Sequence, residues 1–131
     1  MGWTSYGLDQ VAQRLVLDAK ERNTDSLNQS YKMRMATAYG LERFWGEHLR
    51  LQRREQEKAR YWKDTWDALV EAMQEAGFTL PNDTIRSDNV QAVRTMSQKL
   101  WALDIETQRV ALAVLTQLCD CIVWWTQRHK D

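Results

Sequence analysis

The sequence predicts an all-α fold, a single-domain bundle of about five helices that spans residues 1–131. Three observations point to this class. Apolar residues recur at helical spacing along most of the chain. One Pro and five Gly are too few for the many turns that a β fold needs. A length of 131 residues fits one domain with one hydrophobic core.

The first two predicted helices are separated by residues 23–25, Asn-Thr-Asp, which interrupt the helical pattern. Thr4 or Ser5 is suited to cap the first helix, and Asp25 or Ser26 the second. The first stripe consists of Leu8, Val11, Ala12, Leu15 and Ala19. The second consists of Leu27, Tyr31, Met35, Ala38, Trp45 and Leu49.

Gly40 and Gly46 fall inside the second predicted helix, and each should weaken it by roughly 1 kcal/mol unless a neighbour packs against it. From Arg50 to Arg60 the apolar stripe disappears, although strong helix formers continue. A helix that is polar on all sides is typical of a solvated, bridging helix. We therefore expect the basic segment from Arg50 to Lys63 to be helical and exposed over about four turns.

The helical pattern returns after this segment and ends before a loop. The next stripe consists of Trp62, Trp66, Leu69, Val70 and Met73. Gly77 is suited to end this helix, with Pro81 just beyond it. We expect a loop over residues 78–89 and a helix capped by Ser87. That helix carries Val90, Val93, Met96, Leu100 and Trp101.

The last predicted helix starts at Asp104 and is the most apolar segment, which predicts a central, largely buried helix. Polar residues interrupt it, and we judge it too short and too interrupted to span a membrane. Cys119 and Cys121 lie about 200° apart on this helix, so they are not placed to pair with each other. The N-terminus has no charged start and no apolar run. We therefore expect a cytoplasmic protein with reduced thiols, without membrane association.

Charge is distributed unevenly along this neutral chain. Residues 32–63 carry nine Lys and Arg against four Glu, a net charge of +5. Residues 64–131 have a net charge of −4, and residues 1–31 have a net charge of −1. One basic element in an acidic remainder predicts a bound polyanion, or another copy of the chain docked head to tail.

Basic residues and aromatic residues alternate in this segment, which is a pattern suited to nucleic acid. Lys and Arg neutralise phosphates, and aromatic side chains stack on bases. The candidate nucleic-acid-binding residues are Arg43, Arg50, Arg53, Arg54, Lys58, Arg60 and Lys63. The alternative is a solvated helix face with internal ion pairs, such as Arg53–Glu57 and Glu55–Lys58.

An Arg and a His are separated by four residues in the segment from Arg43 to His48. This spacing resembles the motif of HEPN ribonucleases, small all-helical domains in which the Arg steadies phosphate and the His acts in acid–base chemistry. Phe44 stands where that family usually has a polar residue, and the motif lies early in the chain instead of late. We therefore expect no nuclease activity that depends on His48.

Other candidate sites have simpler explanations. Asp120 is the only charged residue between Arg109 and Arg128, and an ion pair with an Arg or a hydrogen bond from a Trp N–H explains it better than a catalytic role. Two His and one Cys-x-Cys give no zinc spacing. We expect no catalytic residue, metal or cofactor. Of the adjacent Trp124 and Trp125, we expect one core ring and one surface ring.

Taken whole, the chain resembles the small subunit of type I or type III CRISPR effector complexes. The five-helix pattern, the basic segment from Arg50 to Lys63 and the Trp-rich helices carry this resemblance. It implies a non-enzymatic subunit that bridges neighbouring copies and steadies bound RNA or DNA. The implied partners are other subunits of the complex, copies of itself and the phosphate backbone of a nucleic acid.

Two alternatives belong to other functional classes. One is a HEPN-like ribonuclease or its inactive partner, for which the spacing of Arg43 and His48 is the distinguishing feature. The other is a protein-interaction bundle that binds no nucleic acid, in which the basic segment is only a solvated surface.

Overall fold

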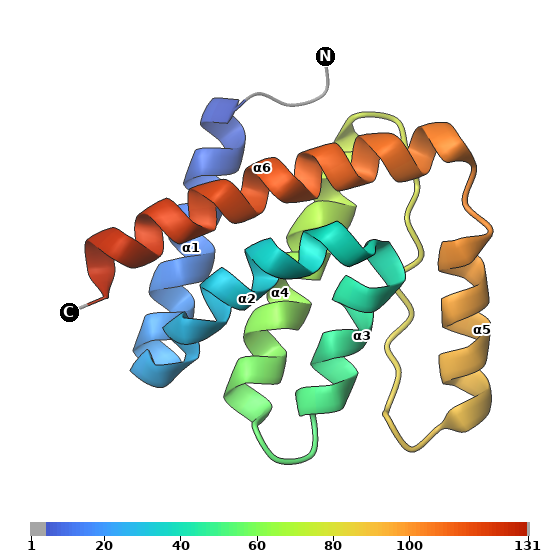
Figure 1. Ribbon diagram of the computed structural model, residues 1–131, viewed down its shortest axis with the longest axis horizontal. Coiled ribbons are helices and arrows are strands. Elements are labelled where there is room, and N and C mark those ends of the chain that lie inside the picture. The colour runs from blue at the N-terminus through green and yellow to red at the C-terminus, as the bar shows by residue number, and fades with distance from the viewer. Residues whose placement is uncertain (1–4, 131) are drawn as a thin grey trace.

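The computed structural model describes residues 5–130, which form six α-helices and two short 3-10 helices and contain no strand (Figure 1). This confirms the predicted all-α bundle, with six helices in place of about five. Thr4 and Ser5 were the two predicted caps of the first helix. Thr4 and the side chain of Ser5 lie outside the part of the chain that the structure describes. The elements are α1 (Ser5–Arg22), η1 (Thr24–Asn28), α2 (Gln29–Ala36), η2 (Thr37–Tyr39), α3 (Leu41–Leu51), α4 (Gln56–Glu75), α5 (Val90–Trp101) and α6 (Ile105–His129).

Gly40 divides the segment that was predicted to be one helix. Its φ of 97° and ψ of 174° lie in a region that is almost restricted to glycine, so the chain turns here between η2 and α3. The predicted stripe is wrong where it crosses this turn, because Met35 and Ala38 are exposed and Met33 is buried instead. Gly46, by contrast, lies inside α3 with ordinary helical neighbours.

The polar stretch after Leu51 is a turn, so the prediction of a continuous exposed helix is wrong. Helix α3 ends at Leu51 and α4 begins at Gln56, and the two helices pack against each other as a hairpin (Figure 1). Both have an aromatic face, and the rings of Phe44 and Trp62 lie 4.8 Å apart. Folding back buries both faces, whereas a straight helix would leave apolar area in water.

The end of α4 agrees with the prediction. Gly77 has a φ of 92°, and the backbone N–H groups of Gly77 and Phe78 donate to the carbonyls of Gln74 and Met73. The cap of α5 differs from the prediction, because Asn89 and not Ser87 accepts a hydrogen bond from a backbone N–H of the first turn. Of the predicted α5 stripe, Val90 and Trp101 are exposed and not buried.

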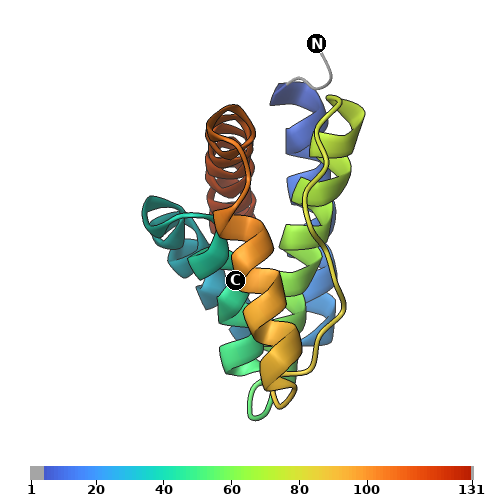
Figure 2. The same cartoon turned by 90° about the vertical axis from the view of Figure 1, so that its right-hand side faces the viewer.

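Helix α6 crosses the other helices and contacts α1, α2, α3 and α4 (Figures 1 and 2). It starts as predicted at Asp104, whose side chain caps it by accepting from the N–H of Thr107 at 2.8 Å. The expectation of a core helix is confirmed for one face. The buried residues of that face are Ala111, Val114, Leu115, Leu118, Cys119, Ile122 and Thr126.

Helix α6 is not too short to span a membrane, so the prediction based on its length is wrong. Its 25 residues make it long and apolar enough to cross a membrane by length and composition, and it is the one such helix in residues 5–130. A core helix passes the same test, and here the apolar face packs on neighbouring helices. The contacts of its apolar face with neighbouring helices, and not its length, indicate that α6 is a core helix of the bundle.

A buried polar network joins α2, α4 and α6 inside the core. The hydroxyl of Ser30 lies 2.6 Å from the hydroxyl of Tyr61 and 2.6 Å from that of Thr126. Burial raises the pKa of Tyr61 to about 12, so this phenol is neutral over the physiological range. The indole N–H of Trp62 donates to the side chain of Gln29 nearby. These bonds satisfy polar groups that would be costly to bury alone.

Candidate nucleic-acid interface

The turn between α3 and α4 presents two arginines to solvent. Arg53 and Arg54 are exposed, and neither forms an ion pair or hydrogen bond within the described part of the chain. The turn lies at the end of the molecule away from α6 (Figure 1). The side chain of Gln52 holds the turn in place, because its Oε1 accepts from the N–H of Ser87 at 3.0 Å.

The other four basic residues predicted on this segment each have a carboxylate partner. Arg50 binds Glu47 through two hydrogen bonds of 2.8 and 2.9 Å. The remaining pairs are Lys58 with Glu55, Arg60 with Asp64, and Lys63 with Asp67. Hydrogen bonding to Glu47 raises the pKa of Arg50, and hydrogen bonding to Lys58 lowers the pKa of Glu55. These pairs cancel much of the local positive charge.

Of the two ion pairs expected from spacing, Glu55–Lys58 is confirmed and Arg53–Glu57 is not. Glu57 instead pairs with Arg22 of α1 at 3.4 Å, and Arg22 also reaches Asp64 at 3.3 Å. Burial raises the pKa of Asp64, and the charges of Arg22 and Arg60 oppose this shift. This group ties α1 to α4 and leaves Arg53 without its expected partner.

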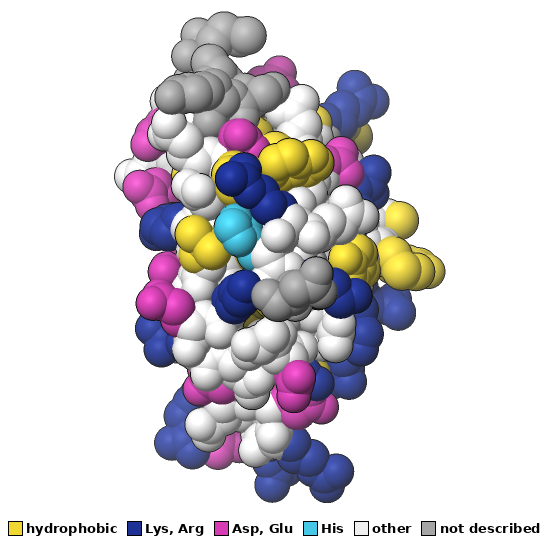
Figure 3. All heavy atoms as spheres, turned by 90° about the vertical axis from the view of Figure 1, so that its left-hand side faces the viewer, with side chains coloured by type: hydrophobic (Ala, Val, Ile, Leu, Met, Phe, Trp, Pro, Cys, Tyr) yellow, Lys and Arg dark blue, Asp and Glu magenta, His cyan; other side chains and the backbone are white. Residues whose placement is uncertain are grey.

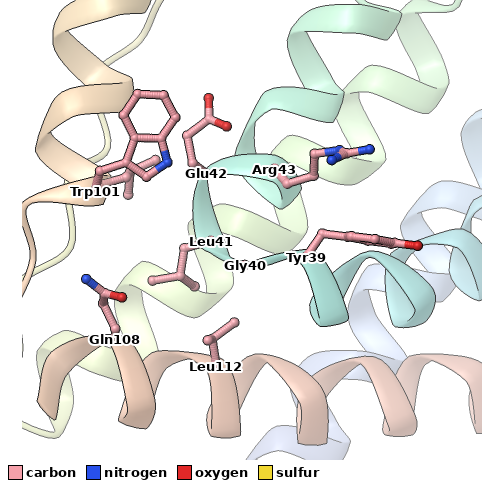
Figure 4. A pocket seen from close by; sticks show the side chains of 9 residues that line it. Tyr39, Gly40, Leu41, Glu42, Arg43, Trp101, Gln108 and Leu112 are labelled. Atoms are coloured by element: carbon pink, nitrogen blue, oxygen red, sulfur yellow. The ribbon is translucent and has the colours of Figure 1, made fainter. Parts of the chain in front are cut away.

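Arg43 lies on α3, one turn after Gly40, and its guanidinium carbon is 4.9 Å from the centroid of the Tyr39 ring. It forms no ion pair among the described residues. Beside it is a pocket of about 330 Å³ between the α2–α3 turn, the end of α5 and the start of α6 (Figure 4). The exposed rings of Tyr39 and Trp101 stand on opposite sides of this pocket, and Leu41 and Leu112 point toward its centre.

Two polar side chains at this pocket already form hydrogen bonds within the protein. The side-chain amide of Gln108 donates to the carbonyl of Leu103 at 2.6 Å, and its oxygen accepts no hydrogen bond among the described residues. One carboxylate oxygen of Glu42 accepts from the hydroxyl of Ser97 at 2.8 Å. The pocket therefore combines apolar walls and exposed rings with one cation, Arg43, one carboxylate, Glu42, and the amide oxygen of Gln108.

Arg43 and His48 are not brought together. His48 is 4% exposed, and its Nδ1 lies 2.5 Å from the carbonyl oxygen of Trp45. Burial lowers the pKa of His48, and the hydrogen bond to Trp45 opposes this shift. Arg43 points into solvent over Tyr39, so the two residues do not face one substrate position.

Lys32, Tyr39 and Trp101 are interface candidates that sequence reasoning missed. Lys32 and Arg43 line a second shallow hollow that shares Tyr39 with the first. Trp101 was assigned to a buried stripe because its spacing from Leu100 and Met96 fits a helix. A Tyr directly before a helix-ending Gly was the available clue for Tyr39, because such a position is at the edge of a helix.

The opposite end of α6 offers a different surface (Figure 3). Trp124 is 54% exposed, and Trp125 is half-buried and donates its N–H to Asp9 at 2.9 Å, close to the expectation of one surface ring and one core ring. Asp120 pairs with Arg34 at 2.5 Å, as expected of an Arg partner, although both side chains are partly exposed. Acidic and basic side chains are mixed on this face, which does not favour a polyanion.

Both cysteines are free, with Cys119 buried and Cys121 half-buried. Burial raises the pKa of the Cys119 thiol, which keeps it neutral. Within residues 5–130 no group of three His, Cys, Asp or Glu side chains is placed to hold a metal ion.

Comparisons with known proteins identify no relative of this chain. No family model matches the sequence, no curated protein is significantly similar to it, and no solved structure matches it significantly.

Proposed function

We propose that this protein is a non-enzymatic, cytoplasmic subunit of a nucleoprotein assembly, of the kind represented by the small subunit of CRISPR effector complexes. In this proposal it bridges neighbouring copies and holds the phosphate backbone of a nucleic acid. The observation that supports it best is the pair of unpartnered arginines, Arg53 and Arg54, at the exposed α3–α4 turn.

Arg43 extends this surface along α3. Arg43 lies near the start of α3, and Arg53 follows the end of this helix in the turn beyond Leu51. Arg43 and Arg50 lie seven residues apart and share one face of α3, so a strand that contacts the turn can follow this face toward Arg43. Arginine contacts to phosphate carry no base information, so binding should be nearly independent of sequence.

The four basic residues that have carboxylate partners play a secondary role in this proposal. They are Arg50, Lys58, Arg60 and Lys63. Exposed ion pairs are worth only about 0–1 kcal/mol, so a phosphate can replace a carboxylate partner at small cost. The acidic partners still repel a polyanion, which predicts weak binding by one isolated copy. Several copies in an assembly raise the effective affinity.

A charge-reversal experiment tests this proposal. Arg53→Glu together with Arg54→Glu should weaken the binding of a labelled RNA or DNA oligonucleotide, as measured by fluorescence anisotropy at two low salt concentrations. Loss of two phosphate contacts should reduce the slope of log affinity against log salt by about 1.4 for a single strand. The matched control is Arg14→Glu with Arg109→Glu, two exposed arginines on α1 and α6. Equal effects of both variants would contradict the proposal.

The ribonuclease alternative has no observation in its favour. A buried, neutral His48 that faces away from Arg43 supports the non-enzymatic assignment. RNA cleavage that disappears in His48→Ala, while the variant remains folded, would overturn that assignment.

A further inference from the structure

Two aromatic rings at the pocket beside Arg43 are exposed, and the Arg43 guanidinium lies over one of them, Tyr39. Tyr39 is 65% exposed and Trp101 is 66% exposed. They come from distant parts of the chain, the α2–α3 turn and the end of α5 (Figure 4). An exposed Trp and an exposed Tyr offer ring faces on which a planar ligand can stack. Arg43 beside them can contact a phosphate, and the same pocket is also lined by the carboxylate of Glu42.

We propose that the pocket between Tyr39 and Trp101 is a stacking site for an unpaired nucleobase. The bound nucleic acid is then single-stranded at this protein, or has at least one base turned out of its helix. This inference rests on the proposed function, because Arg43 serves both sites.

The pocket has the features that a stacked base requires. Its volume of about 330 Å³ and its apolar walls, Leu41 and Leu112, fit a flat ring of nucleobase size. Every base has a π-face, so stacking on Trp101 tolerates any sequence, as does phosphate contact by Arg43. The free acceptor of Gln108 lies at the rim, where it is placed to meet the polar edge of a base.

The pocket is also continuous with the basic surface. Arg43 lines both this pocket and the neighbouring hollow that contains Lys32 and Glu47. Arg43 and Arg50 share one face of α3, which leads to Arg53 at the turn. A single strand with its phosphates along this face can place one base in the pocket. A regular duplex cannot, because its bases are stacked and paired inside the helix.

Trp101→Ala tests this inference against three probes of equal length. The probes are a single-stranded oligonucleotide of mixed sequence, the corresponding duplex, and an abasic sugar–phosphate strand with the same charge. Trp101→Ala should weaken single-strand binding by about 5–150-fold, the effect of one lost stacking contact. Binding of the duplex and the abasic strand, and the salt slope, should be unchanged. Trp101→Phe should restore much of the affinity.

Trp124→Ala is the matched control, because Trp124 is a similarly exposed Trp on another face, and it should have no effect on any probe. An equal loss for single-stranded and abasic probes, or no loss at all, would overturn the stacking site. If Trp101→Ala has no effect but Arg53→Glu with Arg54→Glu weakens binding, only the stacking inference fails. If the unaltered protein binds none of the probes at low salt, both proposals fail. If Trp101→Ala instead releases a co-purifying protein, the face is a protein contact and the inference is wrong.

Discussion

Gly40 and Gly46 are six positions apart, yet the backbone requires glycine at only one of them. The φ of 97° at Gly40 is strained for any residue with a Cβ, although there is open space around it. At Gly46 the backbone is helical, and the nearest atom to an added Cβ is 3.8 Å away. The reversal at Gly40 creates one wall of the pocket, whereas Gly46 only weakens its helix.

Alanine substitutions should therefore have opposite effects at these two positions. Gly40→Ala should lower the free energy of unfolding by about 1–3 kcal/mol because of backbone strain. Gly46→Ala should raise it by about 0.5–1 kcal/mol because glycine is a poor helix former. Urea denaturation of both variants measures the two changes. A higher free energy of unfolding for Gly40→Ala would mean that α2 and α3 are not separated at this residue.

The lowered pKa of His48 should make the free energy of unfolding decrease as the pH falls. Burial places its pKa in the folded protein below the ordinary value of 6.5, so the unfolded chain takes up a proton more readily. The stabilising effect of neutral His48 is fully present above about pH 6.5 and is lost as the pH falls toward the lowered pKa.

The melting temperature should therefore fall between pH 7 and pH 5 more steeply in the unaltered protein than in His48→Gln, which cannot titrate. Parallel profiles for the unaltered protein and His48→Gln would show that folding does not lower the pKa of His48.

At the scale of elements, sequence periodicity predicted the helices that have one continuous apolar face. The stripes of α1 and of the middle of α4 are buried as expected except for Val11 and Val70, which are half-buried, and Asp104 caps α6. Periodicity could not locate the turns. Helix formers from Arg50 to Arg60 favour a continuous helix locally, but burial of the aromatic faces of α3 and α4 outweighs that preference and folds the chain into a hairpin.

The sequence predicted only part of the candidate site, because tertiary contacts determine the rest. Net charge along the sequence located the basic segment, but it did not show which cations are neutralised. Glu57 was expected to pair with Arg53, and it pairs with Arg22 of another helix. The exposure of Tyr39 and Trp101 depends on how α2, α5 and α6 pack against one another. The local sequence around each residue does not determine this packing.

Helix α6 should be the element most sensitive to truncation of a buried side chain. Leu115 is fully buried, so Leu115→Ala should lower the free energy of unfolding by about 2–5 kcal/mol. Gln117→Ala, at an exposed position on the same helix, should change it by less than about 0.5 kcal/mol. Thermal melts followed by circular dichroism check both values. Equal, small effects would contradict the placement of Leu115 in the core.

At the scale of the whole molecule, a neutral protein has three cations without an ion pair at the α3–α4 turn and on α3, namely Arg43, Arg53 and Arg54. Other exposed arginines without an ion pair among the described residues lie singly on other helices, such as Arg14, Arg94 and Arg109. In the proposed function, this local group of cations would orient a polyanion without binding it tightly. It suits a subunit that acts in several copies, in which each copy adds a few phosphate contacts.

Cross-linking in the native host tests the central claim most directly. Cells are irradiated with ultraviolet light, the protein is purified under denaturing conditions, and nucleotide adducts are mapped by mass spectrometry. The account predicts adducts on the peptides that contain Tyr39, Trp101 and the turn with Arg53 and Arg54. Trp124 is an internal control that should carry none. Recovery of the protein without nucleic acid, or with adducts confined to the face around Trp124, would contradict the account.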